Sequence, residues 1–310
     1  MSTCSEVSQG FCGLQSLIGS VIITACRYSP LDKFSAIKCT GVASVTNSFD
    51  SAMEASGREI IKQIVSFFES LGEASLLAWG AITRIIAGDV SLKDTLAQMA
   101  SIGVNSIPIV VITTAFSGAV LSLYTSSLMV QWGAGSLVGG AVSLSVVREL
   151  APVLTAIVVA ARAGSAIAAE IGTMNVTEQI DALRSLGTSP VQYLVAPRFI
   201  ALVCMLPVLT MLGMVIGSFG GYIVALGNGV TAASFLNSTQ VWLRPYDVEM
   251  GLLKTVFFGA FIAIVATQQG LSARGGAAGV GKNTMNSVVI SMLLIYISNF
   301  FLASVMFRSQ

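Results

Sequence analysis

One short stretch resembles a nucleotide-binding loop in its residue types and spacing. The stretch GGAAGVGKNT (Gly275–Thr284) contains the G-x-x-x-x-G-K pattern, read from Gly276 to Lys282. A phosphate-binding loop also needs Ser or Thr directly after the Lys to hold magnesium, and a β-strand before it. Asn283 follows Lys282 here, and an apolar segment precedes the stretch. We therefore interpret it as a tight connection between two membrane spans. In a minor alternative, its backbone and Lys282 contact lipid phosphate.

The adjacent charges Arg148 and Glu149 lie inside an otherwise apolar segment. Counted from Leu137 at 1.5 Å per residue, Arg148 lies about 16 Å along a helix, near the middle of a bilayer core about 30 Å thick. An ionised side chain there costs about 2.5–3.5 kcal/mol, so the two charges must offset each other or pair with other helices. Pro152 also frees the carbonyl of residue 148, which must line a cavity or find a partner. We interpret this as a polar site inside a helix bundle. The alternative is an ion pair that only locks helices together.

The composition excludes several classes of active site. The chain has no histidine, which removes His-based nucleophile activation and metal ligation. Its five cysteines form no C-x-x-C pair, so neither a zinc site nor a redox motif is supported. A polytopic membrane enzyme would also need a metal-spaced carboxylate cluster or a nucleophile elbow, and neither pattern occurs. The net charge of +1 suggests no nucleic acid or other polyanion as a partner.

The apolar segments predict an all-α polytopic membrane protein with five transmembrane helices. Apolar residues make up 54% of the chain and charged residues 10%, against about 25% charged in soluble domains. No charge occurs between Asp94 and Arg148, and a spanning helix needs about 20 apolar residues, so this interval holds one helix and much of another. The predicted spans are residues 104–130, 137–170, 199–226, 251–269 and 288–307.

The first part of the chain has a different composition. Residues 1–49 are rich in Ser and Thr and poor in acids, which is compatible with a targeting peptide or with a bacterial N-terminal extension. From Gly57 onward, Ile60, Ile64 and Phe68 form one apolar helical stripe with charged residues behind it. This pattern favours an amphipathic helix over residues 58–74 that lies in the membrane interface. The alternative is an ordinary amphipathic helix on a soluble core.

The positions of Lys and Arg predict the orientation, because these residues concentrate on the cytoplasmic side. Five spans place the two termini on opposite sides, and an N-terminus inside gives more positive charge to the inner segments. The inner residues are then Arg58, Lys62, Arg84, Lys93, Arg184, Arg198, Arg274 and Lys282. The outer residues are Arg244, Lys254 at a helix edge, and Arg308. Arg162 and Glu170 fall toward the inner interface, where snorkelling is enough to explain them.

The inner segment Met174–Arg198 predicts a short surface helix of about three turns. Asn175 with Glu178 three residues later fits a capping pair, and Gly187 followed by Pro190 fits a helix end. Such a helix, held flat at the membrane surface, suits docking of a soluble partner. The alternative is a surface turn that binds only lipid headgroups.

These segments together closely resemble the MlaE-type permeases of ABC lipid transporters, which work with MCE-domain proteins and include plastid lipid-import permeases. The resemblance is carried by RELAPVLTAIVVAARAGSAIAAEIGTMNVTEQIDALRSLG, by LRPYDVEMGLLKTVFFGAFIAIVATQQGL and by GGAAGVGKNTMNSVVISM. It covers residues 57–308, the expected permease domain, and leaves residues 1–56 outside.

The resemblance implies a homodimeric permease with an interfacial helix, five spans and a cytoplasmic coupling helix between spans 2 and 3. That helix would dock onto a separate ABC ATPase subunit, which binds ATP and magnesium, so the chain itself would be no enzyme and hold no cofactor or metal. The implied coupling residues are Glu178, Gln179, Ile180, Asp181, Ala182, Leu183 and Arg184. The implied lipid-pathway residues are Arg148, Glu149, Val120, Leu121, Leu123 and Tyr124.

The implied function is movement of lipids, foremost phospholipids, between membranes together with an MCE-domain lipid-binding protein. Some actinobacterial relatives in this family move sterols or other apolar compounds. The implied location is the inner membrane of a bacterium with the N-terminus inside, or alternatively the plastid inner envelope membrane. A competing hypothesis is an ion-coupled secondary transporter of an apolar substrate that uses Arg148 and Glu149 for coupling. Against it, no inverted repeat is evident and five spans do not divide evenly.

Overall fold

The computed structural model describes residues 72, 75–81, 83–85, 91–187 and 189–306, all within the compact unit Ser70–Gln310. In this part of the chain, 5 helical segments are long and apolar enough to cross a membrane. The prediction of an all-α protein with five spans is thereby confirmed. The described residues 75–81 and 83–85 are also helical. Of the interfacial helix expected over residues 58–74, only Gly72 is among the described residues.

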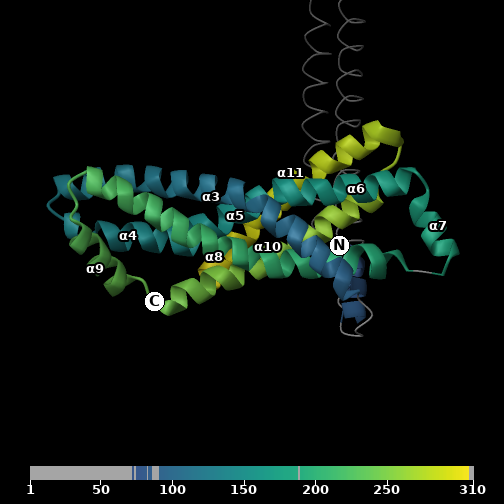
Figure 1. The fold of residues 1–310 in the computed structure, drawn as a ribbon, viewed down its shortest axis with the longest axis horizontal. Helices are drawn as coiled ribbons and strands as arrows, with labels where there is room; N and C mark the ends of the chain where they lie inside the picture. Colours follow the sequence, from purple (N-terminus) through teal and green to yellow (C-terminus); the bar gives the residue numbers. More distant parts are fainter. Residues whose placement is uncertain (1–71, 73–74, 82, 86–90, 188, 307–310) are drawn as a thin grey trace, which may run out of the picture. The chain divides into compact units, whose positions relative to one another are not determined.

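Figure 1 shows how the helices follow one another. Within the described residues, three π-helical segments lie inside the spans. The first span is α3 (Leu92–Gln131), and the short helix between spans 2 and 3 is α7 (Gln179–Ser185). The second span consists of η1 (Gly135–Leu137), α4 (Val138–Ser145), η2 (Val146–Leu150), α5 (Ala151–Val159), η3 (Ala160–Gly164) and α6 (Ser165–Val176). The remaining elements are η4 (Val191–Val195), α8 (Ala196–Gly227), α9 (Ala232–Trp242), α10 (Pro245–Leu271) and α11 (Gly276–Met306).

The helix α3 begins earlier than its apolar composition suggests. The Ser91 side chain caps it by accepting a hydrogen bond from the Asp94 backbone N–H at 3.4 Å, and Asp94 lies in the positive first turn of the helix. The helix α9, between the third and fourth spans, was not expected at all. Thr231 caps it in the same way, accepting from the Ser234 N–H at 3.3 Å. Local capping side chains thus set both helix starts.

Small residues bring α3 and α8 into backbone contact. A Cβ atom on Gly118 would overlap the carbonyl group of Gly217, and one on Gly220 would overlap the carbonyl oxygen of Ala115. The Ser122 hydroxyl uses this closeness to donate to the carbonyl oxygen of Gly221 at 2.7 Å. Small residues are the usual means of close helix packing in membranes, where apolar side chains gain nothing by leaving lipid.

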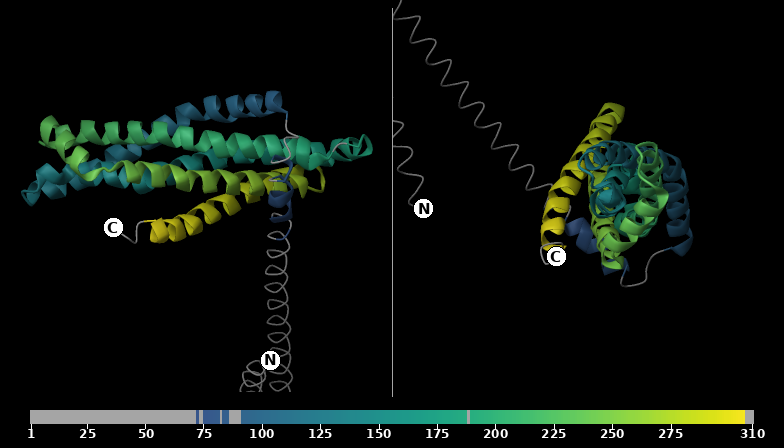
Figure 2. Two further views of the ribbon diagram at one scale, coloured as in Figure 1. Left: turned by 90° about the horizontal axis from the view of Figure 1, so that it is seen from below. Right: turned by 90° about the vertical axis from the view of Figure 1, so that its left-hand side faces the viewer.

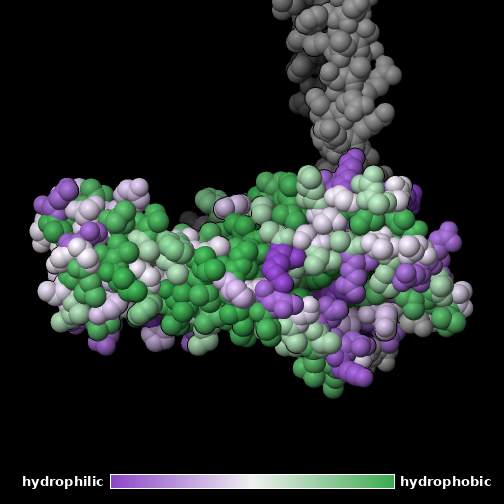
Figure 3. Space-filling view, turned by 45° about the horizontal axis from the view of Figure 1, so that its top comes forward, coloured by the Kyte–Doolittle hydropathy of each residue, from purple (hydrophilic) through white to green (hydrophobic). Residues whose placement is uncertain are grey.

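The helix α10 lies at the centre of the bundle and α11 at its edge. The most apolar window of α10 is 56% buried, against 11% for α11, and both views of Figure 2 place α11 along the outside of the other helices. Figure 3 shows an apolar surface over the middle of the bundle, while hydrophilic residues lie toward its two ends, more densely at one of them. Because α10 is surrounded by other spans, its buried polar side chains must find their hydrogen-bond or charge partners on those spans.

Candidate functional site

The π-helical segment η2 carries Arg148 and Glu149 at membrane depth. Pro152 has no N–H, so it cannot bond back to the carbonyl of Arg148. The Lys254 ammonium, from α10, donates a hydrogen bond to this carbonyl oxygen at 3.2 Å. The expectation that the freed carbonyl needs a partner is therefore confirmed. Such π-helical insertions occur often at functional sites.

The first charge pair joins η2 to the start of α10. The Arg148 guanidinium donates to the Asp247 carboxylate through Nε at 2.8 Å and lies 2.6 Å from it through Nη2. The Asp247 side chain is fully buried, and its second oxygen accepts from the backbone N–H of Arg244 at 3.0 Å. Asp247 therefore caps α10 and pairs with Arg148 at the same time.

The second charge pair joins η2 to α10 and α11. The Lys254 ammonium lies 2.7 Å from Oε1 of Glu149, and its side chain is 0% exposed. The Asn299 side chain, from α11, donates to the other Glu149 oxygen at 2.8 Å, while its own oxygen lies 3.3 Å from Lys254 Nζ. Both oxygens of Glu149 thus have donors from neighbouring spans.

These five residues, Arg148, Glu149, Asp247, Lys254 and Asn299, form what we call the charge cluster. Arg148 and Glu149 each pair with another helix rather than with each other, which was one of the two arrangements left open. Lys254 corrects one sequence interpretation, since it was counted as an outer charge at a helix edge. It lies inside α10 and is buried, because Glu149 and the Arg148 carbonyl offer it oxygen ligands there.

Sequence reasoning missed Asp247, Lys254 and Asn299. Two signals pointed to them. Lys254 lies in an apolar segment, and it follows Asp247 by two helical turns, so both lie on one face of α10. A positive and a negative residue on that face match the opposite charges Arg148 and Glu149.

The apolar residues expected along the lipid pathway do not share one environment. Val120, Leu123 and Tyr124 are exposed on α3, and Leu121 packs against the buried cluster around Val142. In this single chain, three of the four therefore face away from the bundle. Their role in the pathway stays a prediction.

The helix α7 presents a charged face and is anchored by one apolar residue. Ile180 is buried, while Asp181 and Arg184 are exposed and pair with each other at 2.8 Å. The helix has two turns rather than three, and it ends where Gly187 adopts φ +79°. Glu178 precedes it with φ 60°. The residues of α7 on the face turned away from Ile180 are exposed in the single chain.

The predicted capping pair of Asn175 and Glu178 is wrong. Glu178 makes no capping hydrogen bond with its side chain. Asn175 instead donates both amide hydrogens to the end of α10, reaching the carbonyl oxygens of Leu271 and Ala273 at 2.9 Å each. The last carbonyls of a helix have no partner within the helix, and the Asn175 amide supplies donors to them.

The glycine-rich run is mostly helix rather than connection. Only Ser272–Gly275 link the last two spans, because α11 begins at Gly276. The chain turns there with φ +85° at Gly275 and +72° at Gly276, values that favour glycine. Asn283, at the position where a phosphate-binding loop needs Ser or Thr, donates to the carbonyl oxygen of Gln269 at 3.0 Å. Its role is to pack α11 against α10.

Comparisons with known proteins agree with this arrangement. The family described as Permease MlaE matches residues 95–305. A probable ABC transporter permease protein of Synechocystis is 45% identical over 243 residues, covering 78% of this chain and 92% of the relative. The intermembrane phospholipid transport system permease protein MlaE of Haemophilus influenzae is 34% identical, covering 79% and 95%. The chloroplastic protein TRIGALACTOSYLDIACYLGLYCEROL 1 of Arabidopsis thaliana is 36% identical, covering 75% and 67%.

The five spans define a multi-pass membrane protein, with the short helix α7 between its second and third spans. The chain belongs to the MlaE permease family. It is thus the permease subunit of an ABC transporter, and the ATPase is a separate subunit.

Proposed function

We propose that the chain moves phospholipids between two membranes, as a homodimer working with an MCE-domain lipid-binding protein. The observation that carries this proposal is the 34% identity to the Haemophilus phospholipid permease, which extends over 95% of that protein. The charge cluster supports it physically. Its charges are paired inside the bundle, which leaves the outward faces of α3 and α11 apolar enough for acyl chains.

The proposed membrane is the inner membrane of a bacterium or the inner envelope of a plastid. Curated relatives come from bacteria and from a chloroplast. In either case α7 faces the compartment that contains ATP.

The proposed contact with the ATPase is the exposed face of α7, residues 178–184. Ile180 holds the helix to the bundle, and Asn175 ties the preceding turn to the end of α10. Because α10 also carries Asp247 and Lys254, a displacement of α7 reaches the charge cluster through one continuous helix. A movement of α7 caused by ATP hydrolysis on the partner subunit would in this way be transmitted to the membrane spans.

Charge reversal on α7 tests the docking. We expect Asp181→Lys to lower copurification of the ATPase at least about fivefold, because a buried or close charge contact between proteins is worth about 1.5 kcal/mol or more. The permease itself should still insert, since Asp181 is exposed and its ion pair is with the equally exposed Arg184. Glu249→Lys is the matched control, as Glu249 is an exposed acid on α10, outside α7. Full ATPase recovery with Asp181→Lys would contradict the docking site.

Reconstitution tests the substrate. The full complex, purified in mild detergent and placed in liposomes, should move fluorescent phospholipid when ATP is supplied without any ion gradient. Mass spectrometry of the purified complex should find phospholipid and an MCE-domain protein. Movement that needs a proton or sodium gradient and no ATP would instead support the ion-coupled transporter.

A further inference from the structure

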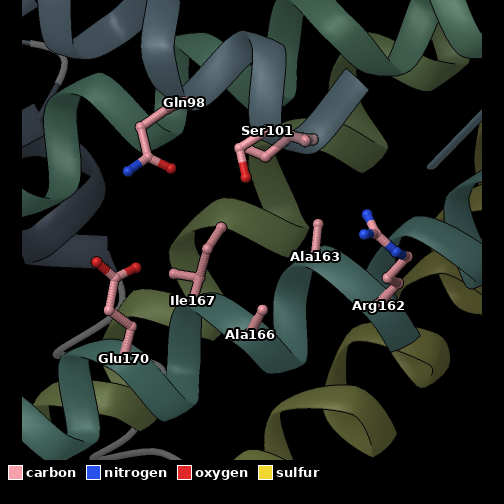
Figure 4. A pocket seen from close by; sticks show the side chains of 8 residues that line it. Gln98, Ser101, Arg162, Ala163, Ala166, Ile167 and Glu170 are labelled. Atoms are coloured by element: carbon pink, nitrogen blue, oxygen red, sulfur yellow. The ribbon is translucent and has the colours of Figure 1, made fainter. Parts of the chain in front are cut away.

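A pocket with both polar and apolar walls lies between the first turns of α3 and the segment formed by η3 and α6. It has a volume of about 180 Å³ and is lined by Gln98 and Ser101 of α3, by Arg162 of η3 and by Glu170 of α6, with apolar residues between them. One water molecule needs roughly 10–15 Å³ by the same measure, so the space accepts a much larger group. Figure 4 shows the polar side chains around the cavity, with Gln98 and Ser101 opposite the α6 residues.

Arg162 enters this pocket with a positive charge that has no carboxylate partner among the described residues. The one hydrogen bond of its side chain within that part of the chain goes from Nη1 to the neutral hydroxyl of Ser106 at 3.2 Å. The nearby carboxylate of Glu170 is already paired, lying 2.9 Å from Nη2 of the buried Arg198. Glu170 and Arg198 therefore neutralise each other, and the pocket keeps the charge of Arg162.

The depth of the pocket matches the headgroup layer. Arg162 lies 27 residues after Gly135, the first residue of the second span, which is about 40 Å along the helix at 1.5 Å per residue. A bilayer with its headgroups is about 40–45 Å thick. If the start of the span lies at one interface, Arg162 lies among the headgroups of the other leaflet, at the α7 end of the bundle.

We propose that this pocket binds the phosphodiester of a phospholipid in the leaflet at the α7 end. The Arg162 guanidinium binds two phosphate oxygens, since its planar donors suit phosphate geometry. The Gln98 amide and the Ser101 hydroxyl, which make no side-chain hydrogen bond to the described residues, donate to the remaining oxygens. Ile102, Ala163 and Ile167 contact the glycerol, and the acyl chains run outside the pocket along lipid-facing α3. The site depends on the membrane placement of the spans and not on which lipid is transported.

Lipid binding to the purified full chain tests this site. The protein in dodecyl maltoside is titrated with dihexanoyl phosphatidylglycerol, and native mass spectrometry counts the bound lipid. We expect Arg162→Gln to weaken binding about tenfold, the effect of losing a charged hydrogen-bonding partner. Arg274→Gln is the matched control, because Arg274 is exposed in the Ser272–Gly275 connection and does not line the pocket. Equal affinity in the wild type and Arg162→Gln would overturn the proposal.

Two further measurements complete the test. The first changes the shape of the pocket without changing its charge, and the second distinguishes a phospholipid from free phosphate as the ligand. Ala166→Phe fills the pocket while keeping every charge, and it should weaken binding as strongly as Arg162→Gln; unchanged binding would overturn the site. Inorganic phosphate and dihexanoylglycerol are the probes for the two halves of the ligand. Each alone should bind at least about tenfold more weakly than the phospholipid. If inorganic phosphate binds as tightly, the site holds free phosphate and the lipid proposal fails.

Discussion

The Lys254 side chain shows how a charge is tolerated deep in a membrane protein. Isolated, it would carry the insertion cost of about 2.5–3.5 kcal/mol for a charge at a helix centre. In the bundle it has a carboxylate oxygen, an amide oxygen and a backbone carbonyl oxygen within 2.7–3.3 Å. Such a group is stable only while every partner is present, so single substitutions should do more damage than paired ones.

We expect Lys254→Met to lower the free energy of unfolding by about 3 kcal/mol, because it leaves the Glu149 carboxylate without its cation. The figure is at the low end of the range for buried pairs, since the Glu149 side chain is 42% exposed. Thermal unfolding in detergent measures the effect. The double variant Lys254→Met with Glu149→Gln should regain at least half of the loss, because both charges are then gone. A double variant as unstable as the sum of the two single variants would show that the pair is not coupled.

At the scale of elements, α3 and α8 form the most extensive helix contact in the described part of the bundle. These helices meet backbone to backbone at Gly118 and Gly217 and at Gly220 and Ala115. Gly118 and Gly220 lack a Cβ atom, which would overlap the facing backbone and push the helices apart. The same contact fixes the rotation of α3, and hence which of its residues face outward.

We expect Gly118→Val to reduce the yield of monodisperse protein severalfold, because overpacking costs about 1–3 kcal/mol and the neighbouring group here is backbone, which cannot move aside. Fluorescence-detected size-exclusion chromatography measures the yield. Gly227→Ala is the control, as a Cβ atom there meets nothing within 4 Å and the residue is also helical. Wild-type behaviour of Gly118→Val would mean that α3 and α8 can separate without cost.

For the molecule as a whole, the two ends of the bundle have different structures. One end has α7 and the Ser272–Gly275 connection, and the other has α9. The apolar face of α11 lies at the edge of the bundle, with Leu293, Ile297 and Phe301 exposed in the single chain. In the proposed homodimer this face contacts either the second copy or lipid.

The proposed orientation places α7 on the side where ATP is present and α9 on the opposite side. In a background with every native cysteine replaced by serine, Ser185→Cys and Asn237→Cys provide one exposed thiol at the C-terminus of α7 and one on α9. A membrane-impermeant maleimide added to intact cells or envelopes should label the α9 position, and should label the α7 position only after lysis. The reverse pattern would invert the topology and remove the proposed access of the ATPase to α7.

Much of this protein follows from local features of its sequence. The apolar runs fix five spans because each must satisfy its own backbone hydrogen bonds in lipid, and Pro152 identifies a carbonyl that needs a partner. Local spacing also indicates where α7 ends, at Gly187. The sequence patterns in these same segments identify the family.

The tertiary structure alone decided which residues meet. The partners of Arg148 and Glu149 lie 99 to 150 residues away in sequence, and their contact depends on how far each helix rotates about its axis. That rotation is set by glycine contacts and by the central place of α10, neither of which is visible in the hydropathy of a single span. For the same reason Asn175, which fits a local cap in sequence, binds the end of α10, and Arg162 lies in a pocket whose other wall belongs to α3.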